Sequence, residues 1–326
     1  MNNKKKFLQR FVKDYNLPIN VFDDDLFEYY KDLYADFFPI DSYNAAVEDI
    51  ENRFNGNVDM WLDHYAHLRD NIINTVMGSD EYKHFNEMNL TSYAIKPVCG
   101  ERSCYNEEAE NKSFISIDLK KANFQALRYM KVFDDESYEK FITRFNGDEY
   151  MMNSKYLRQV IFGKMNAGRQ VAIEKYMMSL IYDAVCNKLK NRGYELYSMN
   201  SDELVFAETE KAVINKQYNT IDGFKNSMKT LLNDIKMMID KYLGFDTTVE
   251  YFTIHRLPII NPNGNKVDAY EKVNYLTGEK KLKKASTTFY PHIYKLWKGM
   301  TINKKDMVFY FENQLATFNE KLKLVE

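Results

Sequence analysis

The chain has 326 residues, of which 45% are hydrophobic and 28% charged, a composition typical of a globular protein and not of a disordered one. The net charge of -2 argues against a protein that is basic all over, but it leaves room for a local basic groove that binds nucleic acid. No stretch approaches the roughly 20 apolar residues of a membrane span, and the three cysteines suggest no disulfide framework. We therefore expect a soluble cytoplasmic protein. Its many Asn, Lys, Tyr and Ile residues are typical of an AT-rich genome such as that of a phage.

The first 90 residues are expected to form helices. Large apolar side chains recur there at intervals of three and four, which is the period of an amphipathic helix. Three stripes show this period: Phe7, Phe11 and Tyr15; Leu26, Tyr29, Tyr30, Leu33 and Phe37; and Trp61, Tyr65, Leu68 and Ile72. Residues 1–90 are therefore predicted to be a helical N-terminal region.

Near residue 91 the pattern changes to short strands and long helices. It predicts, in chain order, strand character at 92–98, a strand at 114–118, a helical region at 118–130, a long helix at 166–192, strands at 194–199 and 203–208, a second long helix at 224–242 and a strand at 248–257. From residue 114 onward this is the element order of a ferredoxin-like βαββαβ unit. The predicted fold class is therefore α+β, with this unit in residues 91–257.

The two long helices each end at a glycine, Gly193 and Gly244, as helices often do. Apolar spacing predicts which side of each helix is buried. For the first helix we expect the buried side to carry Ala172, Tyr176, Leu180, Ala184 and Leu189; for the second, Phe224, Met228, Leu231, Ile235, Met238 and Tyr242.

The tail, residues 258–326, is expected to be a separate element. A hairpin is predicted to turn at Thr277 and Gly278, with helices following at about 288–298 and 305–322. Lysines are dense in this tail and alternate with aromatic side chains, which suits binding of a nucleic-acid backbone through Lys280, Lys281, Lys283 and Lys284. The alternative is that these four lysines form an ordinary solvated face.

Two candidate groups of carboxylates lie at strand ends. Asp118 ends the strand at 114–118, and Asp202 and Glu203 lie at the tip of the predicted hairpin. In a βαββαβ sheet these two places can lie side by side, although Asp118 and Asp202 are 84 positions apart. Converging carboxylates repel unless a cation neutralises them, and Mg²⁺ or Mn²⁺ prefers such oxygen ligands. The alternative is that Asp202 and Glu203 are solvated turn residues.

The same residues carry a resemblance to a known group of enzymes. SIDLKKANFQAL, residues 116–127, resembles motif A of palm-domain nucleic-acid polymerases, especially reverse transcriptases. MNSDELVFAE, residues 199–208, resembles motif C, and its DELVF string is similar to a segment of family A DNA polymerases. The chain lacks the Gly-Asp-Asp and Tyr-x-Asp-Asp strings, so the resemblance, over about residues 110–256, selects no single family.

The resemblance implies roles for several residues. Asp118 and Asp202 would be metal ligands, Glu203 an auxiliary carboxylate, and the tail a thumb-like element. Basic residues before and inside the first long helix would contact the nucleotide triphosphate, as fingers residues do, although an ordinary helix surface is the alternative: Lys155, Arg158, Lys164 and Arg169.

The resemblance also suggests where the sugar of the nucleotide lies. Five positions after Asp118, Asn123 would lie beneath it, and Asn leaves room for a 2′-hydroxyl. This favours use of ribonucleotides or weak sugar discrimination. If the register is shifted by one residue, Phe124 takes this place instead.

We expect the chain to be a template-directed nucleotidyltransferase, a small polymerase or primase-like enzyme that uses two-metal phosphoryl transfer. Its partners would be a nucleic-acid template or primer and nucleoside triphosphates. Two alternatives remain: a nucleotide cyclase-like enzyme on the same fold, which usually carries glycines that the turn at Asn200 lacks, and a non-catalytic nucleic-acid-binding protein.

Overall fold

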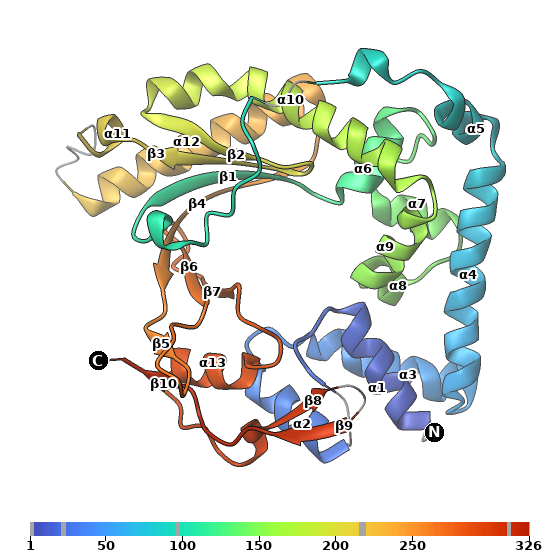
Figure 1. Ribbon diagram of the computed structural model, residues 1–326. Helices are drawn as coiled ribbons and strands as arrows, with labels where there is room; N and C mark the ends of the chain where they lie inside the picture. The colour runs from blue at the N-terminus through green and yellow to red at the C-terminus, as the bar shows by residue number, and fades with distance from the viewer. Residues whose placement is uncertain (1–2, 21–23, 96–97, 215–219, 312–313, 326) are drawn as a thin grey trace. The chain divides into compact units, whose positions relative to one another are not determined.

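The computed structural model describes residues 3–20, 24–95, 98–214, 220–311 and 314–325 (Figure 1). These residues form two compact units, and each unit is assembled from separate stretches of the chain. The first unit contains Met1–Met88, Leu127–Arg169 and Val308–Ala316, and the second contains Asn89–Ala126, Gln170–Met307 and Thr317–Glu326. The units therefore differ from the three consecutive segments that the sequence predicts.

The first unit is mainly helical, as expected for the N-terminal region. Aromatic rings fill its interior; Trp61 and Tyr65, for example, are almost fully buried and lie edge to face at 5.0 Å. The helices are α1 (Asn3–Asp14), α2 (Asp24–Leu33), α3 (Ile40–Phe54), α4 (Val58–Gly78), α5 (Asp80–Glu87), α7 (Tyr138–Arg144), α8 (Glu149–Asn153) and α9 (Lys155–Gly163). The strands β8 (Val308–Phe311) and β9 (Gln314–Thr317) pair with each other.

The second unit is built on a six-stranded antiparallel sheet with the spatial order β2-β3-β1-β4-β6-β7. Its strands are β1 (Ser113–Leu119), β2 (Tyr194–Met199), β3 (Glu203–Glu208), β4 (Thr247–Arg256), β6 (Tyr270–Asn274) and β7 (Lys280–Lys283). Its longer helices are α10 (Ala167–Asn191), α12 (Ile221–Leu243) and α13 (Tyr290–Trp297). The predicted α+β class and the order of elements from β1 to β4 are confirmed.

The helices α10 and α12 lie on the same side of the sheet (Figure 1). Tyr182 of α10 stacks on Phe206 at 6.3 Å, and Phe224 of α12 lies edge to face with Tyr251 at 5.9 Å. Phe206 and Tyr251 both pair with Ile115 of β1, so their side chains project from one face of the sheet. We call this the helix-covered face.

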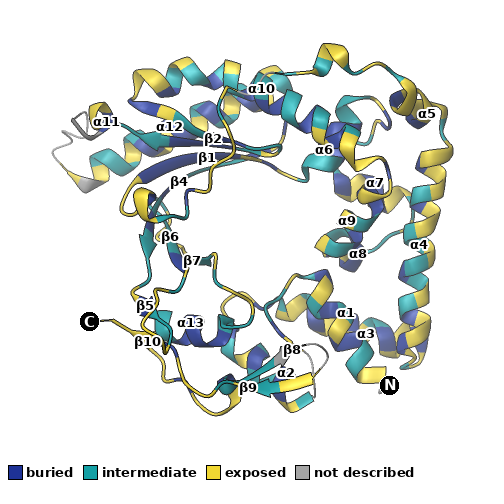
Figure 2. Ribbon diagram, viewed as in Figure 1, coloured by how far each residue is buried: buried dark blue, intermediate teal, exposed yellow. Residues whose placement is uncertain are grey.

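The opposite face of the sheet has an apolar half and a charged half. Phe114, Val205, Phe252 and Tyr270 form a buried cluster with Cys104, so the loop before β1 covers this half. Figure 2 shows the central strands largely in the colour of buried residues. Toward the end of β1, charged side chains replace the apolar ones.

The remaining elements are short. They are α6 (Ala122–Tyr129), α11 (Glu210–Ile214), β5 (Ile259–Ile260), β10 (Lys323–Leu324), and three 3₁₀ turns at Thr91–Tyr93, Glu107–Ala109 and Lys305–Met307. Strand β10 pairs with β5, which anchors the C-terminal segment to the second unit.

Three predicted elements differ from the structure. The expected strand at 92–98 begins instead with the 3₁₀ turn Thr91–Tyr93, and residues 96–97 lie outside the described part of the chain. The predicted helix at 305–322 is wrong, because a 3₁₀ turn and the strands β8 and β9 occupy its place. The hairpin at 270–283 turns where predicted, but it extends the main sheet beside β4 and is not separate from it.

Candidate active site

The carboxylates predicted from the sequence meet at one end of the sheet. Asp118 of β1 lies directly across from Glu203 of β3 in the antiparallel register. The ladder continues one step further, since the backbone N–H of Leu119 donates to the carbonyl of Asp202 over 2.8 Å. The hairpin tip is closed by the Asn200 N–H, which donates to the Glu203 carbonyl over 2.9 Å. Strand pairing thus brings Asp118 next to Asp202 and Glu203.

Alternation along the strands places three carboxylates on one face of the sheet. Residues directly opposite in an antiparallel pair share a face, so Asp118 and Glu203 project together. Glu250 of β4 is opposite Ser116 and therefore joins them. Asp202 precedes β3 at the hairpin tip, where strand alternation does not set its direction, and its charge acts on Asp118.

Two lysines border the acidic residues on the Asp118 side of the sheet. Lys272 of β6 forms an ion pair with Glu250 at 2.5 Å, and its Nζ lies 4.1 Å from the centroid of the Phe252 ring. Lys283 of β7 is half-buried near Glu250 and Glu203, whose charges act on it. Three acids and two lysines thus form a mixed-charge patch, which we define as Asp118, Glu203, Glu250, Lys272 and Lys283.

Crowding makes two of these acids harder to ionise. Desolvation raises the pKa of Asp118, whose side chain nevertheless reaches solvent, and the charges of Asp202 and Glu250 raise it further. Desolvation and the charge of Asp118 raise the pKa of Glu203. Burial also acts to raise the pKa of Glu250, but the hydrogen bond and charge of Lys272 outweigh it and leave that pKa lowered. Additional positive charge would therefore stabilise the ionised patch.

A further acid, Glu174 of α10, lies on the helix-covered side. Its side chain is buried, with 7% of its surface exposed. Burial, followed by the charge of Asp202, raises the pKa of Glu174 to about 7. Because Asp202 acts on both Asp118 and Glu174, it links the mixed-charge patch to the buried acid behind it.

The metal-free protein should lose stability as the pH rises from about 4.5 to about 7. The folded state holds the proton of Glu174 more tightly than the unfolded state, whose pKa is near 4.5. The stability that this group contributes is complete below pH 4.5 and is lost as the pH passes about 7, by about 3 kcal/mol. Urea unfolding in EDTA at pH 5 and pH 8 measures it, and Glu174→Gln should reduce the difference. An equal difference in the two proteins would contradict the prediction.

The carboxylate oxygens of the site are suitable ligands for a divalent cation, although the described side chains do not form a complete set of ligands. Among the residues that the structure describes, no three or more acidic, His or Cys side chains are arranged to hold a metal ion. Mg²⁺ commonly needs only one or two protein carboxylates, with substrate phosphates and water as its other ligands. Asp118 and Asp202 could meet this requirement, because desolvation and the charge of Asp202 raise the pKa of Asp118, and a cation would favour its ionised form.

The two candidates for the sugar contact differ in exposure. Asn123 and Phe124 lie in the first turn of α6, which follows β1. Phe124 is buried with 2% of its surface exposed, whereas Asn123 is half-buried and its Oδ1 accepts from the Phe124 N–H over 3.0 Å. Because Phe124 is buried, Asn123 is the more accessible of the two. Its contact with the sugar stays a prediction.

The four predicted triphosphate-binding cations all belong to the first unit. There Arg169 donates to the carbonyl oxygens of Phe85 and Met88, which gives its guanidinium a structural role after α5. Arg158 lies over the ring of Tyr138 at 5.8 Å. The predicted role of Lys155, Arg158, Lys164 and Arg169 in binding the triphosphate stays a prediction.

The four lysines of the predicted nucleic-acid-binding cluster do not form one surface. Lys281 is opposite Lys272, and Lys283 is opposite Tyr270, so both project on the Asp118 side of the sheet. Lys280 alternates to the other side, where it pairs with Glu271 at 3.1 Å. Lys284 follows β7 and donates to the Tyr105 carbonyl over 3.2 Å.

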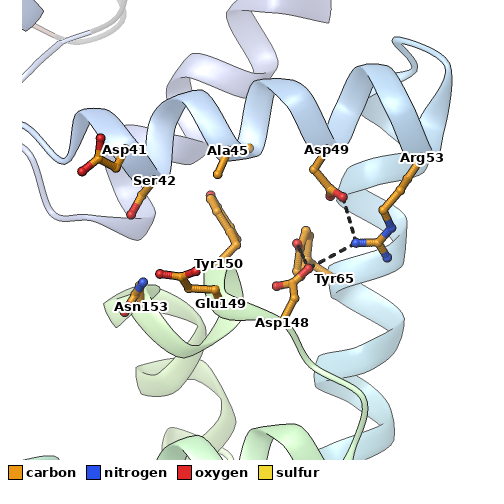
Figure 3. Close-up of a pocket in the computed structure, with 11 residues that line it drawn as sticks. Asp41, Ser42, Ala45, Asp49, Arg53, Tyr65, Asp148, Glu149, Tyr150 and Asn153 are labelled. Carbon is orange, nitrogen blue, oxygen red and sulfur yellow. Dashed lines mark hydrogen bonds and ion pairs between the residues drawn. The ribbon is translucent and has the colours of Figure 1, made fainter.

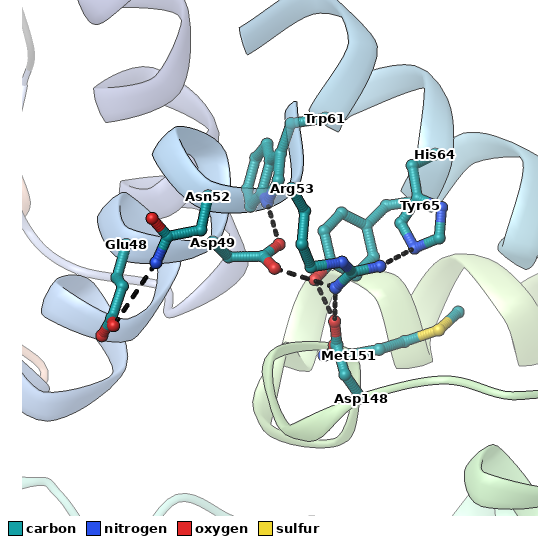
Figure 4. Close-up of polar contacts among 9 residues, drawn as sticks. All are labelled: Glu48, Asp49, Asn52, Arg53, Trp61, His64, Tyr65, Asp148 and Met151. Carbon is teal, nitrogen blue, oxygen red and sulfur yellow. Dashed lines mark hydrogen bonds and ion pairs between the residues drawn. The ribbon is translucent and has the colours of Figure 1, made fainter. Parts of the chain in front are cut away.

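A pocket of about 380 Å³ lies in the first unit (Figure 3). Four of its polar residues contact one another, as Figure 4 shows: Asp49, Arg53, Tyr65 and Asp148. Arg53 contacts Asp49 at 2.8 Å and Asp148 at 3.3 Å, and the Tyr65 hydroxyl donates to Asp148 over 2.5 Å. The Nε2 of His64 accepts a hydrogen bond from the Arg53 guanidinium over 3.3 Å. We regard this network as a structural tie among α3, α4 and α8.

Sequence reasoning missed three residues of the site. Glu250 lies between Val249 and Tyr251, and a charged side chain among apolar neighbours was the available signal there. Lys272 follows Glu271, so its sequence context gave no such signal. Glu174 lies on the buried side of α10, next to Ile173 and three positions before Met177. A carboxylate at a buried position of a helix was the signal there, but the predicted buried side did not include it.

Comparisons with known proteins place no constraint on this assignment. No protein-family model matches the chain, no curated protein does, and no solved structure does. None of the helices in the described ranges has the length and apolar character needed to cross a membrane.

Proposed function

We propose that the chain is a template-directed nucleotidyltransferase, a small polymerase or primase-like enzyme with a palm-type sheet. The observation that carries the proposal is the pairing of Asp118 with the hairpin that presents Asp202, from positions 84 residues apart. The strand order β2-β3-β1-β4, with two helices on one face, supports a ferredoxin-like palm, and the mixed-charge patch supports phosphate chemistry.

The proposed reaction joins a primer to a nucleotide. The 3′-oxygen of the primer attacks the α-phosphorus of a nucleoside triphosphate, the bond to the bridging oxygen of pyrophosphate breaks, and the hydroxyl proton passes to solvent. Two Mg²⁺ or Mn²⁺ ions held by Asp118 and Asp202 would stabilise both the attacking and the leaving oxygen. Lys272 and Lys283 would offset the charge of phosphate groups on the Asp118 side of the sheet.

The direct test offers a labelled primer on DNA and on RNA templates, with ribonucleotides and deoxyribonucleotides in turn. Template-dependent extension with Mg²⁺ or Mn²⁺ would support the proposal and identify the template and sugar that the enzyme uses. A cyclic product from triphosphate alone would instead indicate a cyclase. Binding of the primed template without any nucleotide incorporation would indicate a non-catalytic binding protein.

Neutralising Lys281 and Lys283, on the Asp118 side of the sheet, should lower the affinity for nucleic acid. It should also make that affinity depend less on salt concentration. In Lys281→Gln/Lys283→Gln, each lost phosphate contact should reduce the log–log salt slope by about 0.7 to 0.9. Lys280→Gln is the matched control, because Lys280 lies on the same strand but projects from the other side. Fluorescence anisotropy with a labelled primed template at several salt concentrations measures the slope. Equal slopes for Lys281→Gln/Lys283→Gln and Lys280→Gln would show that nucleic acid does not bind preferentially to the face that carries Lys281 and Lys283.

A further inference from the structure

Glu174 of α10 carries a buried carboxyl in the second unit. It lies on the buried side of α10 among Ile173, Met177 and Met178, and 7% of its surface is exposed. No described residue donates a hydrogen bond to it or forms an ion pair with it. An isolated buried carboxyl costs stability, so a purely structural role leaves this residue type unexplained.

Tyr182, about two turns after Glu174 on α10, stacks on Phe206 of β3, the strand that follows Asp202, so this helix covers the strand next to Asp202. The charge of Asp202 acts on Glu174. A second acid beside Asp202 increases repulsion in the metal-free protein and offsets none of it. The neighbouring cation Lys175 does not relieve this, since it is directed to Glu101 at 4.0 Å. Protonation of Glu174 relieves this repulsion at low pH, and a positive ion with its water molecules between the two acids would relieve it when both are ionised.

We propose that Glu174 is a positioning residue of the cation site at Asp202, and that its carboxylate accepts hydrogen bonds from water molecules bound to a divalent cation there. The inference rests on the metal site of the proposed function. Mg²⁺ retains several of its water molecules in proteins, and groups that hold such water orient the ion without contacting it. A water-mediated role also agrees with the lack of three grouped ligands among the described residues.

The test measures binding of Mn²⁺ to the full chain by the electron paramagnetic resonance signal of the free ion. Glu174→Gln keeps the shape of the side chain and should weaken Mn²⁺ binding by about 10-fold or more. Asp202→Asn should weaken it at least as much. Glu195→Gln, which changes an exposed acid on β2, is the matched control and should bind Mn²⁺ as the wild type does.

A second readout shows whether the variant is folded. Glu174→Gln should melt at or above the wild-type temperature in EDTA, because a buried carboxyl has been removed, and Mn²⁺ should raise its melting temperature less than that of the wild type. Wild-type Mn²⁺ affinity in Glu174→Gln would overturn the inference, as would the same Mn²⁺-dependent rise in melting temperature.

These measurements separate this inference from the proposed function. If Mn²⁺ binding depends on Glu174 and Asp202 but no nucleotide is incorporated, the positioning role stands and the polymerase proposal fails. If the wild type extends primers but Glu174→Gln binds Mn²⁺ normally, the polymerase proposal stands and the positioning role is overturned. Absence of Mn²⁺ binding in the wild type, at concentrations up to several times those that support extension, would also overturn the positioning role.

Discussion

Replacing Asp118 or Asp202 with Ala should abolish metal-dependent nucleotide incorporation, with a loss on the order of 1,000-fold or more. Each variant removes a carboxylate that would hold a cation at the reacting phosphate, and a loss of this size corresponds to about 4 kcal/mol of transition-state stabilisation. Single-turnover extension of the primed template that the wild type uses measures the effect. The fold should persist, because removing one of two repelling acids lowers the electrostatic strain of the metal-free protein.

Two further variants show whether the loss is specific. Glu195→Ala removes an exposed acid from β2 in the same sheet and should leave the rate unchanged. Glu203→Ala should cost less than Asp202→Ala, because Asp118 and Asp202 are the proposed metal ligands and Glu203, opposite Asp118, is an auxiliary carboxylate. Near wild-type turnover in both Asp118→Ala and Asp202→Ala, with melting temperatures unchanged, would show that the palm assignment is incorrect.

The pairing at the site could be predicted because short strands leave few alternatives. Residues 114–118 and 203–208 each carry strand-forming side chains, and a tight turn at Asn200 fixes how β2 and β3 pair. Once β3 lies beside β1, the register places Asp118 opposite Glu203. The sequence contains this information locally, in the turn and in the order of the elements.

The buried side of α10 was predicted incorrectly from the sequence. The predicted side carries Ala172, Tyr176 and Leu180, which are only half-buried. The structure instead buries Ile173, Met177, Met178, Ile181 and Val185, about a quarter turn away. Apolar side chains occur on both sides of this helix, so packing against the sheet decides between them. Glu174 was missed for this reason, because a glutamate on a helix is unusual only when it lies on the buried side.

The C-terminal differences have a related cause. Strand β4 is long enough to pair with β1 through Ser113–Leu119 and also to offer its outer edge to β6. An open edge of this kind accepts a further hairpin, which is a long-range event that local patterns do not reveal. The error at 305–322 was avoidable, because the run Val-Phe-Tyr-Phe at 308–311 has strongly strand-forming side chains.

Asp306→Ala should destabilise the protein by about 3 to 5 kcal/mol, the usual cost of leaving one partner of a buried ion pair alone. Asp306 is fully buried, and its Oδ2 lies 2.7 Å from Nζ of Lys295, whose side chain is 5% exposed. The same carboxylate accepts from the Asn303 N–H over 2.7 Å, and the Asp306 carbonyl is 3.0 Å from Nε2 of His292. One carboxylate thus fixes α13 to the turn that follows it.

Urea unfolding near pH 7 measures this loss, and Lys266→Ala is the control within the same unit. Lys266 pairs with Glu107 at 3.2 Å, but both side chains are more than half exposed, so its removal should cost at most about 1 kcal/mol. The double variant Lys295→Met/Asp306→Leu should recover much of the loss, because it leaves neither charge buried without a partner. If Asp306→Ala were no less stable than Lys266→Ala, the buried pair would have no structural role. If the double variant were as unstable as Asp306→Ala, the hydrogen bonds to Asn303 and Thr301 would contribute more than the charge pairing does.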